Sequence, residues 1–192
     1  MEPAAAPGFL MAAVQRPAAE IEDFDAAVRL HWPGIFRFVL ASVRDPDAAG
    51  NLTQDCFLRA YRARARFRGD CAVRTWLMQI AVNLVRDYAR NRRLQFWNRA
   101  RESAVDLDLA GNWIADRNLS PEARASAKEQ LGAVWEASAR LSERQRTVFL
   151  LRFVEDLDLL EIAVATGMKE GTVKVHLFRA LRSIREALGR PR

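Results

Sequence analysis

Cysteine and histidine are scarce in this chain, with two of each among 192 residues. Cys56, Cys71, His31 and His176 do not share the spacing of a zinc site, and two cysteines are too few for the disulfide framework of a small secreted domain. We therefore expect both cysteines to be small core residues in a reducing compartment. The sequence predicts no bound metal, no cofactor and no small-molecule substrate.

Long apolar runs are missing as well. No segment approaches the roughly 20 apolar residues that a helix needs to cross a bilayer. The apolar residues 9–14 are not preceded by the basic segment that opens a signal peptide. The chain also lacks a convincing alternation of apolar and polar residues that would indicate strands. These absences predict an all-α, soluble, cytoplasmic protein without direct membrane insertion.

Lysine is rare too, with 3 residues against 27 arginines. The net charge is +6, and arginine supplies nearly all of the positive charge. A chain this basic is typical of proteins with a polyanionic partner. Arginine presents a planar fork of donors that suits phosphate and the edge of guanine. The same bias can equally reflect genome composition, and the sequence does not separate the two explanations.

Apolar residues at helical spacing dominate the first half of the chain. Residues 1–19 are rich in Ala and Pro and predict a flexible tail. From residue 21 one apolar stripe follows spacings of three and four, and Pro33 within it is expected to kink or split the helix near Trp32. Further helices are expected at about 48–65 and 73–93, with a loop at 67–70 between them. The stripe consists of Ile21, Phe24, Val28, Trp32, Ile35, Phe36, Val39 and Val43.

Charge divides the chain into segments. Residues 59–101 hold twelve arginines and two aspartates, whereas residues 102–129 hold six acidic and three basic residues. The acidic segment has little periodicity, which favours a linker. Ser120, Pro121 and Glu122 then form a helix start, and Ser142 with Gln145 forms a capping box. We therefore predict two small helical domains, at 20–96 and 121–192, joined by a flexible linker at 97–120.

The end of the chain has the pattern of a helix-turn-helix. Asp158 and Glu161 form a capping box, and Gly167 supplies a turn where a positive φ is easily adopted. The second helix turns Val173, Leu177 and Leu181 inward and shows a basic side of Lys174, His176, Arg179 and Arg182. Such a unit places its second helix in the DNA major groove. The alternative is an ordinary helical hairpin with a solvated basic face.

Four stretches together resemble a bacterial RNA polymerase sigma factor of the extracytoplasmic-function (ECF) type, a group of the sigma-70 family. The resemblance covers residues 20–190 apart from most of the linker. It rests on residues 46–57 (PDAAGNLTQDCF), on 67–70 (FRGD) with 74–77 (RTWL) and 80–83 (IAVN), on 141–149 (LSERQRTVF), and on 170–174 (EGTVK) with 178–180 (FRA). The four motifs in this order are far more specific than any one of them.

The resemblance implies three binding surfaces. Contact with the clamp helices of core polymerase is implied for Asn51, Leu52, Gln54, Asp55, Phe57 and Leu58. Binding and melting of the −10 element are implied for Phe67, Arg68, Gly69, Asp70, Arg74, Trp76, Asn83, Arg86, Arg90, Arg92 and Arg93. Binding of the −35 element is implied for Thr172, Lys174, Val175, His176, Phe178, Arg179 and Arg182. For Trp76 a core role is the alternative, because a Trp in an apolar stripe is more often buried.

The chain also departs from the family pattern. Ala48, Gly50 and Asn51 stand where acids are usual, Lys169 where a capping Ser is common, and His176 where Arg is frequent. The resemblance nevertheless implies a protein that is not an enzyme, that acts in a stress or envelope response, and that is controlled by an anti-sigma factor. Two alternatives remain: a free-standing helix-turn-helix regulator, and an enzyme using Asp106 and Asp108 as a metal pair.

Overall fold

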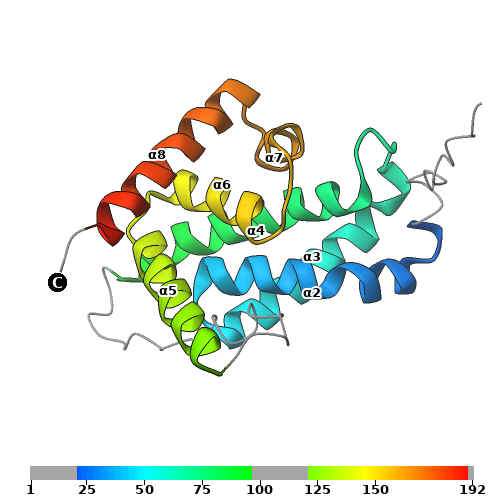
Figure 1. Ribbon diagram of the computed structural model, residues 1–192. Coiled ribbons are helices and arrows are strands. Elements are labelled where there is room, and N and C mark those ends of the chain that lie inside the picture. The colour runs from blue at the N-terminus through cyan, green and yellow to red at the C-terminus, as the bar shows by residue number, and fades with distance from the viewer. Residues whose placement is uncertain (1–20, 97–120, 190–192) are drawn as a thin grey trace, which may run out of the picture.

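The computed structural model describes residues 21–96 and 121–189, and all regular structure within these ranges is helical (Figure 1). The first group of helices is α2 (Phe24–Val43), α3 (Pro46–Ala63), the short 3-10 helix η1 (Arg64–Arg66) and α4 (Val73–Phe96). The second group is α5 (Pro121–Ala139), α6 (Glu143–Phe153), α7 (Leu159–Thr166) and α8 (Glu170–Leu188). The prediction of an all-α fold with two helical groups is confirmed. The tail at 1–19 and the linker at 97–120 lie outside the described residues.

Local capping explains where the first helices begin. The Asp23 carboxylate accepts a hydrogen bond from the backbone N–H of Ala26 at 2.9 Å and starts α2. Asp45 accepts from the N–H groups of Asp47 and Ala48 at 3.1 and 3.0 Å, with Pro46 in the first helical turn. Helix α3 therefore begins two residues earlier than the apolar pattern alone predicts.

Pro33 does not split α2, so the expected break is wrong, whereas the expected kink stays a prediction. The helix runs without interruption from Phe24 to Val43 with Pro33 inside it. Ala27 before the proline and Ile35 and Phe38 after it are all buried. Burial of both halves in one core outweighs the roughly 3 kcal/mol that an internal proline costs a helix.

The first group forms a three-helix core. Ile35, Phe38 and Val39 of α2 pack with residues of α3 and of α4, including Leu77 and Met78, all of which are almost fully buried. Cys56 lies inside this core, and burial raises the pKa of its thiol to about 12. The expectation for Cys56 is confirmed. Cys71 is only half-buried in the loop before α4, so the same expectation is wrong for it.

The second group contains the predicted helix-turn-helix. The Asp158 carboxylate accepts from the backbone N–H of Glu161 at 2.8 Å, and the Glu161 carboxylate accepts from the backbone N–H of Asp158 at 2.9 Å. Gly167 ends α7 at a φ of 69°. Lys169 gives α8 no side-chain cap, as its sequence predicts. Val173 of α8 is fully buried, and Leu177 and Leu181 pack at the edge of the core.

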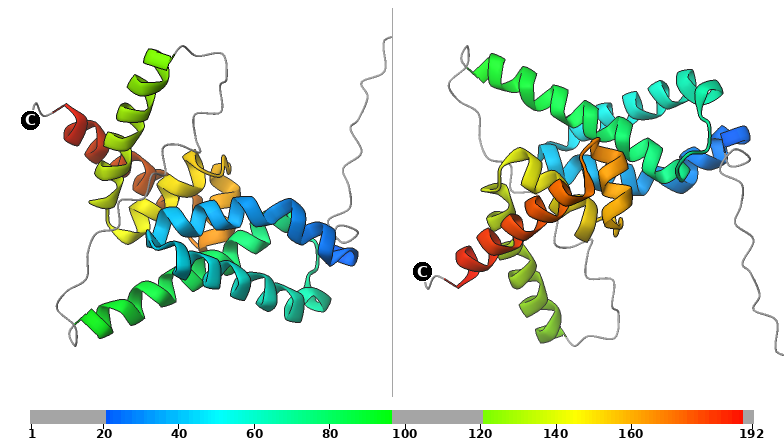
Figure 2. Two further views of the ribbon diagram at one scale, coloured as in Figure 1. Left: turned by 90° about the horizontal axis from the view of Figure 1, so that it is seen from below. Right: turned by 90° about the horizontal axis from the view of Figure 1, so that it is seen from above.

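The two groups of helices lie directly against each other. Helix α7 packs on α4 and α6 packs on α2, so the C-terminal helices cover one side of the N-terminal bundle (Figure 2). A single cluster of buried apolar residues runs through both groups. The proposed domain boundaries stay a prediction, but the two modules form one compact body in this structure.

Candidate functional site

The outer face of α8 is open to solvent along most of its length. Thr172, Lys174, Val175, Phe178, Arg179 and Arg182 are all exposed there. Val175 and Phe178 are 47% and 68% exposed, which is unusual for large apolar side chains. Lys174 and Arg182 form ion pairs with Glu170 and Glu186 on their own helix, at 2.7 and 2.8 Å. The face therefore combines exposed cations with exposed apolar groups, a mixture that suits the floor and walls of a DNA groove.

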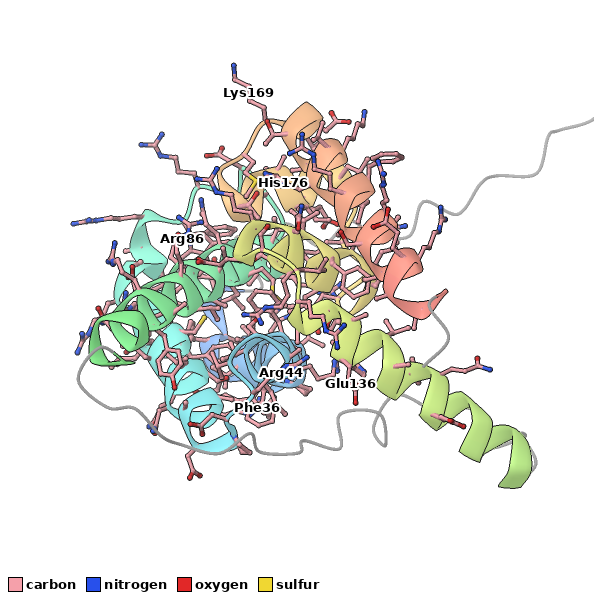
Figure 3. The ribbon with its side chains drawn as sticks, turned by 90° about the vertical axis from the view of Figure 1, so that its left-hand side faces the viewer. Phe36, Arg44, Arg86, Glu136, Lys169 and His176 are labelled. Carbon is pink, nitrogen blue, oxygen red and sulfur yellow. The ribbon has the colours of Figure 1, made fainter. Side chains whose placement is uncertain are left out.

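His176 differs from its neighbours on α8. Its side chain is half-buried, and its Nδ1 is buried without a hydrogen-bond partner (Figure 3). Burial, followed by the positive charges of Arg144 on α6 and of Arg179, lowers the pKa of the imidazole. Its half-burial sets His176 apart from the exposed residues of this face.

The loop before α4 carries the predicted base-capturing residues. Arg68 and Asp70 are exposed, and Gly69 has a φ of 77°, a conformation that favours glycine. The rings of Phe67 and Trp76 lie 4.9 Å apart. Trp76 is only half-buried, so the structure supports parts of both of its interpretations: it packs at the core edge and keeps an accessible surface.

Three polar residues extend the predicted promoter surface along α4. Asn83, Arg86 and Arg90 are exposed, and Arg90 also pairs with Asp87 at 2.9 Å. Arg86 can be followed on α4 in Figure 3. The side chains of Arg92 and Arg93 lie outside the described residues, so their predicted role is not placed.

Arg74 is the exception among these residues, because it contacts the other module. Its guanidinium donates to the backbone carbonyl of Glu155 and to the Glu155 carboxylate, the latter at 3.2 Å. Sequence reasoning missed Glu155 and its second partner, Arg37. The sequence offers one weak signal, because Glu155 directly follows the apolar residues Phe153 and Val154. Its burial, with 1% exposed, is visible only in the structure.

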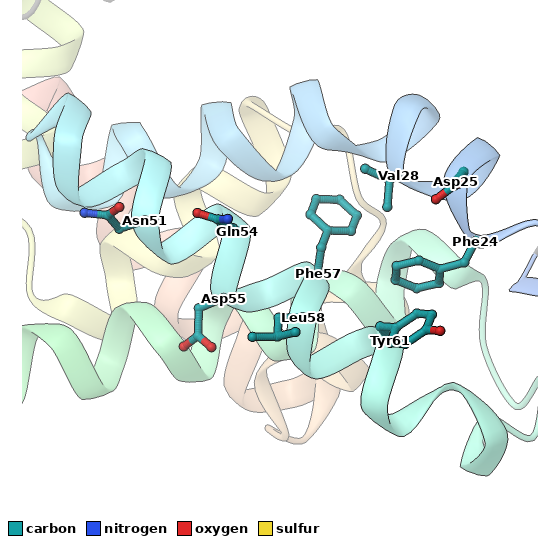
Figure 4. A pocket seen from close by; sticks show the side chains of 9 residues that line it. All are labelled: Phe24, Asp25, Val28, Asn51, Gln54, Asp55, Phe57, Leu58 and Tyr61. Atoms are coloured by element: carbon teal, nitrogen blue, oxygen red, sulfur yellow. The ribbon is translucent and has the colours of Figure 1, made fainter.

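A groove between α2 and α3 collects the predicted polymerase-binding residues (Figure 4). It has a volume of about 530 Å³. Phe57 is buried at its base, while Asn51, Gln54 and Leu58 are exposed. Five of the six predicted residues line this groove; Leu52 instead packs at the edge of the core. The lining consists of Phe24, Asp25, Val28, Asn51, Gln54, Asp55, Phe57, Leu58 and Tyr61.

The groove is apolar with an acidic edge. Phe24 and Tyr61 close one end with an edge-to-face ring contact at 5.3 Å. Asp25 and Asp55 supply its negative charge, and Asp55 is paired with Arg59 at 2.9 Å. The sequence places Phe24 and Val28 in the apolar stripe of the first helix, and Tyr61 at a position of the next helix that is available for burial. Tyr61 is in fact 46% exposed, which only the packing of α2 on α3 reveals.

Two other classes of site are not found among the residues that the structure describes. No cluster of three or more His, Cys, Asp or Glu side chains could hold a metal ion there. In those same ranges no helix is long and apolar enough to cross a membrane. Asp106 and Asp108, the alternative metal pair, lie outside the described residues.

Comparison with known families matches both halves of the chain. Residues 27–95 match the family model described as sigma-70 region 2, and residues 131–184 match the model described as sigma-70, region 4. The first match spans α2 to α4, including the groove and the loop before α4. The second spans the C-terminal half of α5 together with α6, α7 and α8 up to residue 184.

Curated relatives agree with these matches. The RNA polymerase sigma-H factor of Pseudomonas aeruginosa is 34% identical over 170 residues, which cover 86% of each chain. The ECF RNA polymerase sigma-E factor of Escherichia coli is 34% identical over 140 residues, or 70% of each chain. The ECF sigma factor SigW of Bacillus subtilis is 26% identical over 168 residues, 87% of this chain and 89% of that one.

Solved structures share the fold. The sigma factor RpoE, solved in complex with the anti-sigma factor NepR from Bartonella quintana, matches with a TM-score of 0.69 and 22% identity over 89% of this chain and 99% of that one. CnrH, solved with the cytosolic domain of CnrY, matches with a TM-score of 0.62 and 19% identity over 90% and 94%. Family models and relatives together show that this chain belongs to the sigma-70 family of RNA polymerase sigma factors, within its ECF group.

Proposed function

We propose that this sigma factor divides promoter recognition among three surfaces. The groove between α2 and α3 binds core RNA polymerase, α8 reads the −35 element, and the loop before α4 with the exposed side of α4 holds and opens the −10 element. The chain itself is not an enzyme; the polymerase supplies the chemistry, in the cytoplasm. The observation that carries this proposal is the presence of an apolar, acid-edged groove and an exposed recognition helix in one chain.

The groove suits a helical partner with apolar and basic side chains. Leu58, Tyr61 and Val28 offer apolar contact, and Phe57 forms the floor. Asp25 and Asp55 at the edge attract positive charge and set the orientation of the partner. The clamp helices of core polymerase are the partner that the family implies. Asn51 can supply hydrogen bonds at a position where acids are usual in the family, and Gln54 adds a second amide beside it.

The face of α8 suits direct reading of bases. Arg179 is exposed and can place two donors on the acceptor edge of guanine. Val175 and Phe178 can contact thymine methyl groups, which are the apolar feature of the major groove. Thr172 lies in the first turn of α8, where backbone N–H groups and a hydroxyl favour phosphate. His176 is half-buried beside this face and can offer a single polar contact.

The loop before α4 suits a base that has left the stack. An extruded base needs a pocket, stacking surfaces and hydrogen-bond partners on its edge. Phe67 and Trp76 supply ring surfaces, and Arg68 and Asp70 supply polar groups beside them. Arg86 and Arg90 lie further along α4 and can contact the phosphates of the same strand.

An anti-sigma factor is the proposed inhibitor. The solved structures of RpoE and CnrH were obtained as complexes with NepR and with the cytosolic domain of CnrY. The likeness of fold supports a partner of the same kind for this chain. The groove between α2 and α3 is a suitable place for such a partner to compete with polymerase.

Run-off transcription tests the proposed function. The purified chain is added to core polymerase on a library of promoter fragments, and core alone serves as the control. We expect transcripts that require both components and that start at a shared sequence. Tight binding of duplex DNA by the chain alone, without any transcript from the mixture, would instead indicate a free-standing regulator.

A further inference from the structure

We propose that Glu155 is the centre of an intramolecular latch that holds the two modules together and restrains the sigma factor until polymerase and promoter separate them. Closure of the two modules does not depend on the proposed function. Restraint on transcription does rest on the proposed function. The latch consists of Gly34, Arg37, Arg74, Thr75, Glu155 and Glu161.

The buried carboxylate of Glu155 is held entirely by the other module. Glu155 lies between α6 and α7, and its side chain is 0% exposed. Its Oε2 lies 3.3 Å from a guanidinium nitrogen of Arg37 on α2 and 3.2 Å from one of Arg74 on α4. A buried charge needs opposite charge nearby, and here both partners come from the N-terminal module. Separating the modules therefore breaks both ion pairs at once.

Gly34 gives the carboxylate the room that it needs. A Cβ at position 34 would lie 2.8 Å from Oε2 of Glu155, closer than side-chain atoms normally approach. Gly34 lies inside α2, where glycine costs about 1 kcal/mol relative to alanine. Its use in the middle of a helix is therefore explained by the close approach of Glu155.

Two further contacts tie the modules on either side of Glu155. The hydroxyl of the buried Thr75 donates to Oε1 of Glu161 at 3.2 Å, which seats the first turn of α7 on α4. Arg44, after α2, donates to the carbonyl of Trp135 on α5 at 2.6 Å. The turn after Glu155 is braced as well: Arg152 pairs with Asp156 at 3.2 Å and donates to the carbonyl of Leu157 at 3.1 Å.

The latch is balanced rather than strongly stabilising. Oε1 of Glu155 has no hydrogen-bond partner although it is buried. Desolvation raises the pKa of this carboxyl even though Arg37 and Arg74 oppose the shift. Buried ion pairs of this kind fix a geometry without adding much net stability. Such a contact can hold one arrangement and still be opened by a partner that binds the separated modules.

Closure conflicts with promoter binding on two counts. Arg74 and Thr75 lie beside Trp76 at the start of α4, and the latch covers them with the C-terminal module. Elements at −10 and −35 lie about 25 base pairs apart, or roughly 85 Å along B-DNA. A compact chain of this length has a radius of gyration of about 16 Å and so spans only roughly 40 Å. The modules must separate for both elements to be bound together.

The test uses a double variant that breaks the latch outside the three proposed binding surfaces. Gly34→Ala displaces the Glu155 carboxylate, and Arg37→Ala removes one of its two ion pairs. The matched control is Gly132→Ala with Arg29→Ala, because a Cβ at Gly132 meets nothing within 4 Å and Arg29 is an exposed arginine on α2. Circular dichroism serves to check that both variants keep the helical content of the unaltered chain.

Small-angle X-ray scattering of the free protein reports closure, and run-off transcription at limiting sigma concentration reports restraint. We expect the latch variant to have a larger radius of gyration and to reach half-maximal transcription at a concentration lower by about threefold or more. The control should match the unaltered chain in both measurements. An unchanged radius overturns the latch, and expansion without a gain in transcription overturns the restraint. Absence of transcription by the unaltered chain would instead count against the proposed function, while scattering would still test the closure.

Discussion

At the residue scale, Arg179 is the residue on which the proposed base reading by α8 depends most directly. Its guanidinium is exposed on the face that also carries Val175 and Phe178. We predict that Arg179→Ala weakens binding by about 1–3 kcal/mol on a promoter that carries the preferred base pair at one −35 position. On a promoter in which that base pair is changed, the substitution should have little effect. Binding of polymerase containing each variant to single-base −35 mutants measures this. Arg185→Ala, which removes an exposed arginine from the last turn of the same helix, is the control; an equal loss on every mutant would rule out base reading.

His176 provides a prediction about pH. Burial and the charges of Arg144 and Arg179 lower the pKa of its imidazole below the ordinary value. A histidine with a lowered pKa adds stability above the ordinary pKa of about 6.5, and this contribution is lost as pH falls through the lowered value. Proton NMR can follow the ring, because the chain has only one other histidine, His31. We expect His176 to titrate below pH 6.5; titration above that value would show that the ring is not held as described.

Glu155 provides the opposite pH dependence. Burial raises the pKa of its carboxyl, so closure favours the protonated form. The stabilisation of the closed arrangement by Glu155 is complete below the ordinary carboxyl pKa. It is lost as pH rises through the raised pKa. The charged groups that face it are Arg37 of α2 and Arg74 of α4; Glu161 of α7 lies next to Thr75 close by. Glu155→Gln mimics the neutral carboxyl, and we predict that it removes this part of the pH dependence of the radius of gyration. An identical pH profile for both proteins would contradict the assignment.

At the scale of elements, the pairing of α2 with α3 creates the groove that is proposed to bind polymerase. Leu58 is 45% exposed inside it, and Leu30 is 66% exposed on α2 outside it. Neither leucine is a core residue, so a charge at either position should leave the fold intact. We predict that Leu58→Asp weakens binding to core polymerase at least tenfold, about 1.4 kcal/mol, whereas Leu30→Asp does not. Fluorescence anisotropy of the labelled protein with core polymerase measures both, and equal affinities would move the polymerase surface elsewhere.

Most elements were predictable because their signals are local. Asp45, Asp158 and Gly167 mark helix ends through contacts within four residues, and the spacing of Val173, Leu177 and Leu181 identifies the buried side of α8. The interruption expected at Pro33 did not occur, because burial on both sides of the proline is a tertiary effect. The lowered pKa of His176 likewise depends in part on the charge of Arg144 on α6, which the pattern of α8 alone does not contain.

The contact between modules was not predictable, for the same physical reason. Arg37 and Glu155 are 118 positions apart, and neither residue carries a motif. Gly34 also gives no signal until Glu155 lies beside it. Arg74 was predicted from its motif to face DNA, whereas in this structure it holds Glu155. A residue can serve both roles only in two different arrangements of the modules.

At the scale of the whole molecule, a chain whose two modules pack together in this structure is proposed to grip DNA at two points. The groove and the face of α8 are accessible in the closed arrangement, whereas the start of α4 is covered. Polymerase or the −35 element can therefore bind before the modules separate. The start of α4 can meet the −10 element only afterwards, because the closed arrangement covers it.

The most direct test of the proposed two-point grip is a combined footprint of polymerase carrying this sigma factor on a promoter selected by run-off transcription. Hydroxyl radicals report protection, and permanganate reports unpaired thymines. The two-point grip predicts two protected segments centred about 25 base pairs apart, with unpaired thymines only in the downstream segment. A single protected segment, or two segments without unpaired thymines, would contradict it.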